Sequence, residues 1–337
     1  MEDRARRNNI QPIQIALSVV TTAWSTPELR DELYLQLSKQ TRSNDNVATC
    51  ELGWELMAIC ANFVPATKQF TPYIEGYIGR HLQDGQQGRV QHYAEHCLKK
   101  LIRIHAQGAK KGVHAPTESE VRQAQKNIFD PSMFNSSLEE IMEAQRRFAP
   151  TECKIPWVVT TLTEAVIQSG GAQTEGIFRV PGDIDAVNML KVQLDRGDAV
   201  EPGTFGEPHI PASTLKLWFR ELTDPLVPEE LYDECVNASK DIPASLAAVA
   251  KMPPLNRLLL TYIVRFLQVI GQPDNHAVTK MNYENLSMVW APNFLRCPSD
   301  DPLQILQFAK REMTFTRNLV TQMDTSEAKK LGNLGEL

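Results

Sequence analysis

Apolar residues recur at helical spacing along almost the whole chain, and segments in which apolar and polar residues alternate are hard to find. A repeat of three to four residues is typical of amphipathic helices, whereas strict alternation is typical of half-buried strands. The sequence therefore predicts an all-α protein. Helices are expected over about residues 26–37, 52–63, 73–82, 90–104, 118–127, 155–167, 215–222, 255–270, 283–290 and 303–323, with a further helix beginning near residue 183.

The stretch over residues 108–135 interrupts this pattern. It contains Pro116 and Pro131 and only one modest helical segment, which is typical of a domain boundary. The first 131 residues carry 16 basic and 14 acidic side chains, and the remainder carries 19 and 27, so the two parts differ in charge. We therefore expect two helical domains in tandem and a C-terminal tail, over residues 1–131, 132–325 and 326–337.

Composition excludes several classes of protein. With 35 Lys and Arg against 41 Asp and Glu, the net charge of −6 gives no overall attraction to nucleic acid or to anionic lipid. Six cysteines without a C-x-x-C pair favour neither a zinc ribbon nor a disulfide framework, and they indicate a reducing compartment. Because no run approaches 18 apolar residues and no secretory signal begins the chain, we expect a cytoplasmic protein without a transmembrane segment.

Two short motifs resemble enzyme sites only superficially. His92, Glu95 and His96 match the H-x-x-E-H pattern of zinc peptidases, but the segment continues as a plain amphipathic helix, so we interpret it as structural and expect no metal. Ser213 and Lys216 match S-x-x-K without the other motifs of that acyl-transferase site. Phosphate-binding loops are also missing from the sequence, so we expect no cofactor.

A single arginine stands in the apolar segment GIFRVPGD. Ile177 and Phe178 can anchor this loop while Arg179 projects, between a permissive glycine and a Pro-Gly turn that leads into a helix. Either a nearby acid such as Glu175 or Asp183 pairs with this arginine, or the loop presents it to a partner.

Three more polar residues lie in or beside apolar helices. Lys216 and Arg220 are four residues apart and share a helix face, where the two like charges are mildly unfavourable. They form either a solvated face with an Arg220–Asp224 pair or a site for an anionic partner. Asn293 interrupts an apolar run just after a helix, where it either satisfies backbone groups or points into a site.

The first domain has a run of cations without an acid between them. This run is either a solvated helix end, since cations complement the negative end of the helix dipole, or a site for an acidic filament or a lipid surface. Its members are Lys99, Lys100, Arg103, Lys110 and Lys111.

Three segments of the second domain together carry a family resemblance. In chain order they are GIFRVPGD, LKLWFRELTDPLVP and NLSMVWAPNFL. The combination resembles the RhoGAP family, the all-helical GTPase-activating modules for Rho-type small G proteins, and the resemblance covers about residues 133–322.

This resemblance implies a role for each of the four polar residues. Arg179 would be the arginine finger that is supplied in trans to accelerate GTP hydrolysis, Lys216 and Arg220 the basic pair beside it, and Asn293 a contact to the G protein. The partner would be a Rho-family small GTPase in its GTP state. That partner would bind GTP and Mg²⁺, so this chain would be a GTPase activator and not itself an enzyme. The alternative is a non-activating scaffold that links the cytoskeleton to a small G protein.

The first domain is similar to another helical module. Its segments PELRDELYLQLSKQT and GWELMAICANFVP resemble the myosin tail homology 4 domain, over about residues 10–130. That resemblance implies cytoskeletal targeting, with microtubules as the expected partner. The pairing with a RhoGAP module resembles the Vilse (CrossGAP) Rho GTPase-activating proteins, which favours Rac-like or Cdc-type G proteins.

Overall fold

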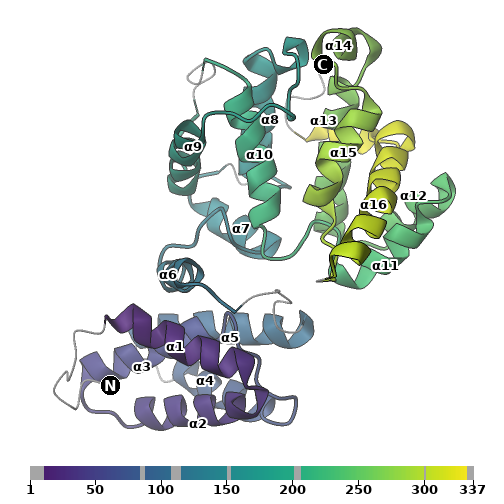
Figure 1. Ribbon diagram of the computed structural model, residues 1–337. Coiled ribbons are helices and arrows are strands. Elements are labelled where there is room, and N and C mark those ends of the chain that lie inside the picture. Colours follow the sequence, from purple (N-terminus) through teal and green to yellow (C-terminus); the bar gives the residue numbers. More distant parts are fainter. Residues whose placement is uncertain are drawn as a thin grey trace. The chain divides into compact units, whose positions relative to one another are not determined.

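The computed structural model describes residues 11–83, 88–107, 115–149, 153–200, 206–299 and 301–331, and within these ranges it contains helices and no β-strand. The predicted all-α class is therefore confirmed. The chain divides into two compact units, Met1–Pro131 and Ser132–Leu337 (Figure 1). Each unit has its own cluster of buried apolar side chains.

The first unit is a helical bundle around α3. In this bundle α3 packs against α1, α2, α5 and α6, and its Trp54 is fully buried with its ring stacked on Tyr77 at 5.9 Å between ring centroids. The helices are α1 (Pro12–Ser25), α2 (Arg30–Thr41), α3 (Val47–Cys60), α4 (Thr71–Gln83), α5 (Arg89–Gln107) and α6 (Glu118–Lys126), with a 3-10 turn at Pro27–Leu29.

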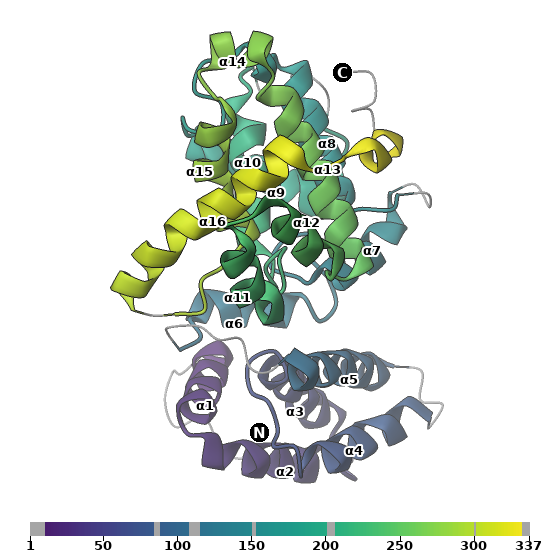
Figure 2. The ribbon, with the colours of Figure 1, turned by 90° about the vertical axis from the view of Figure 1, so that its right-hand side faces the viewer.

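The second unit is built around two helices, α10 and α16, each of which packs against several others. α10 packs against α8, α9 and α15, and α16 packs against α11, α12, α13 and α15 (Figure 2). Its helices are α7 (Leu138–Ala144), α8 (Trp157–Gln168), α9 (Ile184–Arg196), α10 (His209–Glu221), α11 (Glu229–Ala238), α12 (Ile242–Ala250), α13 (Pro254–Ile270), α14 (Pro273–Thr279), α15 (Tyr283–Phe294) and α16 (Pro302–Gln322). No helix in the described part of the chain combines the length and the apolar character that crossing a bilayer requires.

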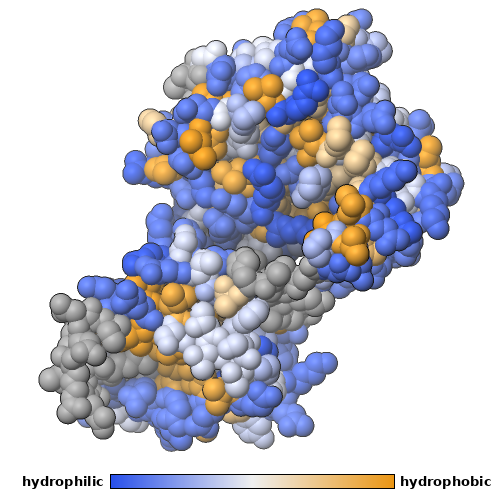
Figure 3. Space-filling model, viewed as in Figure 1, coloured by the Kyte–Doolittle hydropathy of each residue, from blue (hydrophilic) through white to orange (hydrophobic). Residues whose placement is uncertain are grey.

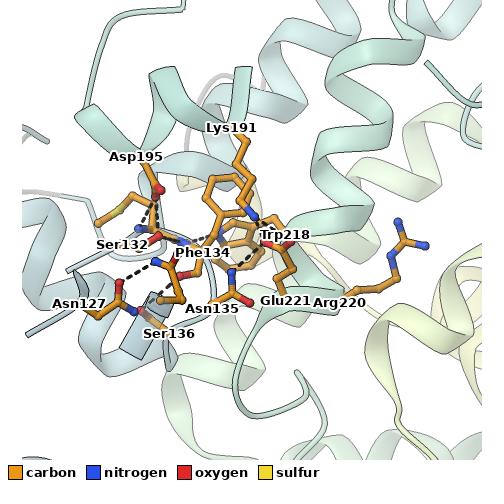
Figure 4. A network of polar contacts seen from close by, with 12 residues as sticks. Asn127, Ser132, Phe134, Asn135, Ser136, Lys191, Asp195, Trp218, Arg220 and Glu221 are labelled. Carbon is orange, nitrogen blue, oxygen red and sulfur yellow. Dashed lines mark hydrogen bonds and ion pairs between the residues drawn. The ribbon is translucent and has the colours of Figure 1, made fainter. Parts of the chain in front are cut away.

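A polar network holds α9 and α10 to the first residues of the second unit (Figure 4). The indole N–H of Trp218 donates to the carbonyl of Met133 at 2.8 Å, and Asp195 accepts a hydrogen bond from the backbone N–H of Met133, also at 2.8 Å. Lys191 on α9 and Glu221 on α10 form an ion pair at 2.6 Å. These contacts fix α10 at its C-terminal half, which is the half that carries Arg220.

Several boundaries differ from the sequence prediction; α10, for example, begins at His209 instead of near residue 215. α15 continues through Pro292 to Phe294 instead of ending near residue 290, because the buried Phe294 and Leu295 hold the last turn although the proline lacks an N–H. The segment over 326–337 was expected to be a separate tail, but it begins with a 3-10 turn (Ser326–Lys330) whose Ala328 is fully buried in the core of the second unit.

Candidate functional site

Arg179 lies in a tight loop between the 3-10 turn Gly171–Gln173 and α9. The backbone N–H of Gly176 donates to the carbonyl of Thr279 at 2.8 Å, which ties the loop to the end of α14. The N–H groups of Arg179 and Val180 both return to the carbonyl of Gly176, at 2.8 and 2.9 Å. Gly176 has a φ of 71°, a conformation that glycine adopts without a steric penalty.

Phe178 anchors the loop in the core. Its side chain is fully buried and makes edge-to-face contacts with Phe266 on α13 and Trp290 on α15, at 5.8 and 5.2 Å between ring centroids. Its φ is 68°, which costs a bulky residue about 1–3 kcal/mol. Burial of an aromatic side chain contributes about 1.5–3 kcal/mol, so the core offsets this strain and fixes the residue next to Arg179.

The helix α10 holds the loop at two further points. The ammonium of Lys216 donates to the carbonyl of Phe178. The hydroxyl of Ser213 accepts a hydrogen bond from the backbone N–H of Gly182 at 2.9 Å. Burial lowers the pKa of Lys216, and the positive charge of Arg220 lowers it further. The two residues of the S-x-x-K motif therefore both support the arginine loop.

Gly182 allows the loop to lie directly on the first turn of α10. A Cβ atom at this position would be 2.7 Å from the backbone carbon and oxygen of His209 and 2.8 Å from the Cα of Ile210. Backbone atoms cannot rotate away as a flexible side chain can, so any larger residue would push the loop off the helix.

Arg179 itself is exposed at the apex of this braced loop. Among the residues that the structure describes, none accepts a hydrogen bond or forms an ion pair with its guanidinium. Asp183, one of the two acids expected to neutralise it, caps α9 instead, because its carboxylate accepts from the N–H of Ala186 at 2.9 Å. The alternative of a locally paired arginine is therefore wrong for the described part of the chain.

The other three predicted site residues have different environments. Arg220 is exposed and extends away from the polar network (Figure 4), without an ion pair to Asp224 or any other described residue. Asn293 is only 5% exposed; its Nδ2 donates to the carbonyl of Val289 at 2.8 Å. The Oδ1 of Asn293 is buried and has no hydrogen-bond partner among the described residues.

Hydrophobic residues are scattered on one face of the second unit (Figure 3). On the face seen in Figure 3, its coloured hydrophobic residues form separate spots among hydrophilic ones. On that face the hydrophobic residues do not join into one broad apolar surface.

The first unit contains the H-x-x-E-H segment and the cationic run that begins in α5. His92 bonds to the carbonyl of Ile128 and stacks on Phe129 at 4.7 Å, which gives the H-x-x-E-H segment a structural role. Within the cationic run, Lys99 is exposed and Arg103 is half-buried, but Lys100 is only 8% exposed.

The expectation that Lys100 belongs to an exposed patch is therefore wrong. Lys100 falls on the buried stripe of α5, three residues after the fully buried Cys97 and one residue before the buried Leu101. Lys110 and Lys111 lie outside the described residues.

Sequence reasoning missed two residues, one that seats the arginine loop on α10 and one that binds the end of α10. Gly182 was visible only as part of a Pro-Gly turn, and nothing in the sequence indicated what it packs against. Arg296 follows the NLSMVWAPNFL segment directly, and its guanidinium donates to backbone carbonyls at the end of α10. No periodicity marks such a residue, because its partners are backbone atoms 74 to 77 positions away.

Comparison with known families decides what the two units are. The family model of the MyTH4 domain matches residues 16–123, and that of the RhoGAP domain matches residues 156–299. The chain contains a MyTH4 domain followed by a RhoGAP domain. All the loop contacts described above lie in the RhoGAP domain, as do Arg179, Lys216, Arg220 and Asn293.

Several curated proteins are similar to the RhoGAP part of the chain. GTPase activating protein homolog 3 of Dictyostelium discoideum is 36% identical over 189 residues, which are 56% of this chain and 14% of that protein. Rho GTPase-activating protein 24 of Homo sapiens is 32% identical over 187 residues, which are 53% of this chain and 24% of that protein. The chain thus spans less than a quarter of the length of these relatives.

One solved structure supports the fold. The crystal structure of human Rho GTPase activating protein 15 superposes with a TM-score of 0.53 at 22% identity, covering 63% of this chain and 99% of that one. At this identity the match shows the helical fold alone.

Proposed function

We propose that this protein is a GTPase-activating protein for Rho-family small G proteins, with Rac-like or Cdc-type members as its substrates. The observation that carries the proposal is the exposed Arg179, which has no partner among the described residues and stands on a loop braced from four helices. The similarity to proteins named as Rho GTPase-activating proteins supports the same assignment.

The chemistry follows from what small G proteins lack. They hydrolyse GTP slowly because negative charge that develops on the transferred phosphoryl group is incompletely neutralised. The planar guanidinium of Arg179 would donate hydrogen bonds to the phosphate oxygens as that charge develops. GTP and Mg²⁺ would be bound by the G protein, so this chain would supply one cation to another protein's active site and no nucleophile of its own.

A single-turnover assay of GTP hydrolysis tests this proposal. Arg179→Ala is expected to remove most of the stimulation, which for an arginine finger is about 10³ to 10⁵-fold. Arg179→Lys is expected to recover little, because an ammonium lacks the planar fork. Arg196→Ala, at an exposed arginine in the last turn of α9, is the matched control and should leave the rate unchanged.

The rival function, a scaffold that binds the G protein without activating it, makes the opposite prediction. In that case Arg179→Ala and the unaltered protein would give the same hydrolysis rate while binding was retained. A panel of Rho, Rac and Cdc-type substrates in the same assay identifies the preferred partner.

We assign Arg220 and Asn293 to the docking of the G protein, and Lys216, which was expected beside them, to the support of the arginine loop. Arg220 is exposed and would meet acidic or carbonyl groups directly, whereas Lys216 would act mainly by holding the loop. The side chain of Asn293 would have to turn outward to hydrogen-bond the partner, because its Oδ1 is buried in the unbound chain. Arg220→Ala should raise the concentration needed for half-maximal stimulation more than it lowers the saturating rate.

For the MyTH4 domain we propose a role in attaching the protein to the cytoskeleton in the cytoplasm, with microtubules as the partner. The match to the domain family supports this assignment. Within the cationic run of α5, Lys99 is exposed and Arg103 is half-buried. Replacing both with Glu should weaken co-sedimentation with microtubules, and added salt should weaken that of the unaltered protein. Unchanged co-sedimentation would exclude this surface of α5.

A further inference from the structure

Arg296 makes an unusual set of contacts at the C-terminal end of α10. Its Nη2 donates to the carbonyls of Phe219, Arg220 and Leu222, at 3.1, 2.8 and 2.6 Å. Its Nη1 lies 3.4 Å from the carbonyl of Thr223. A single guanidinium thus serves two carbonyls that the last turn of α10 leaves without helical donors, those of Phe219 and Arg220, and two carbonyls just beyond the helix.

The positive charge of Arg296 is favourable at the C-terminal end of α10. Helix carbonyls give the C-terminal end a partial negative charge, which a cation complements. Burial lowers the pKa of Arg296 and nearby Asp224 raises it, but an arginine side chain remains protonated in proteins. Its planar fork can serve several carbonyls at once, whereas a lysine offers one compact ammonium.

The contacts of Arg296 join the two helices that carry the docking residues. Arg296 follows α15 and lies three residues after Asn293, while one of its acceptors is the carbonyl of Arg220 itself. The backbone N–H of Val227 also donates to the carbonyl of Phe294 at 2.9 Å, which holds the end of α15. The positions of Arg220 and Asn293 therefore depend on the same junction.

We infer that Arg296 is a positioning residue for G-protein docking, which acts by setting the end of α10 and thereby the direction of Arg220. This inference rests on the proposed function. Arg296 itself is half-buried, and its Nη1 and Nη2 groups are directed to backbone carbonyls and not to a partner.

A double-mutant titration tests the inference. Single-turnover hydrolysis is measured against the concentration of the unaltered protein, Arg296→Lys, Arg220→Ala and the double variant. Arg296→Lys is expected to raise the half-saturating concentration about tenfold, the factor given by loss of one charge-assisted hydrogen bond, and to lower the saturating rate less than about threefold. In the Arg220→Ala background the same change should have less than about a twofold effect.

The matched control is Arg257→Lys. Arg257 also donates to a carbonyl in the last turn of another helix, that of Ala250 in α12, at 3.3 Å. This substitution makes the same chemical change away from the docking residues and should leave the half-saturating concentration unchanged. Arg296→Gln, which keeps N–H donors without a charge, is a second variant, and the thermal unfolding midpoint of each variant is measured in parallel.

Several results would overturn the inference. Effects of Arg220→Ala and Arg296→Lys that multiply would show that Arg296 does not act through Arg220. Unfolding of both Arg296 variants, or equal losses in saturating rate and half-saturation, would mean that it acts only on the fold. If Arg179→Ala abolishes stimulation and Arg296→Lys matches the unaltered protein, only this inference fails. If Arg179→Ala changes nothing, the proposed function fails as well.

Discussion

Replacing Gly182 with alanine would test how strongly stimulated GTP hydrolysis depends on the contact between the arginine loop and the first turn of α10. The new Cβ would be 2.7 Å from two backbone atoms of His209, and ordinary van der Waals contact begins at 3.4 Å. The loop must therefore move by about 0.7 Å. Gly182 does not have a positive φ, so the substitution changes space and leaves the backbone conformation allowed.

Two consequences follow from a shift of this size. The hydrogen bond from the N–H of Gly182 to Ser213, now 2.9 Å, would lengthen beyond hydrogen-bonding distance and lose about 1 kcal/mol. Overpacking adds about 1–3 kcal/mol to the loss of stability. Because a misplacement of about 1 Å at a reacting centre can cost about 10²-fold in rate, we expect stimulated hydrolysis to fall by about 10- to 100-fold.

The assay is single-turnover GTP hydrolysis at saturating protein, combined with thermal unfolding. Gly76→Ala is the control, because a Cβ at this position in α4 meets nothing within 4 Å. It should stabilise the chain by about 0.5–1 kcal/mol, as expected for glycine in a helix, and should leave the rate unchanged. A Gly182→Ala protein with the unaltered rate at saturation would refute the argument that α10 fixes the loop.

Two other changes have clear expected outcomes. Lys216→Met removes the donor to the carbonyl of Phe178 and should lower the saturating rate of hydrolysis; a change in half-saturation alone would contradict the bracing role. Glu312 is buried and accepts a hydrogen bond from Tyr232 at 2.5 Å; burial raises the pKa of Glu312, and this hydrogen bond only partly opposes the shift. A carboxyl with a raised folded pKa contributes stability that is complete below its unfolded pKa and is lost as pH rises through the folded value. Glu312→Gln should therefore gain stability relative to the unaltered chain as the pH rises above about 4.5, the ordinary pKa of the glutamate carboxyl, as measured by urea unfolding, and parallel pH dependences would contradict this.

The sequence was sufficient for the fold class and for most long helices. Strongly periodic segments such as α5, α13 and α16 were expected within a few residues of their observed bounds, because one buried face sets their pattern. Helices α1, α7, α11, α12 and α14 were not expected. In α12, the segment IPASLAAVA is almost uniformly apolar or small, so no polar face shows the helical repeat.

The candidate site was less accessible to sequence reasoning. The motifs located Arg179, but whether an acid neutralised it depended on where Asp183 pointed, and that is decided by the cap of α9. Lys216 and Arg220 lie one helical turn apart on α10, but only Lys216 binds the arginine loop. Its acceptor, the carbonyl of Phe178, is 38 positions away in the sequence. Contacts of this range leave no trace in local spacing.

The exposed Arg179 directly follows a side chain that belongs to the interior of the domain. Phe266 and Trp290, which cradle that side chain, are wholly inaccessible to another protein. If the proposed function holds, substitutions at these two positions would nevertheless mimic loss of the Arg179 side chain. The effect would increase on warming, since a loosened interior lets the loop move before the domain unfolds. Temperature-sensitive signalling defects would thus map to sites that no partner ever contacts.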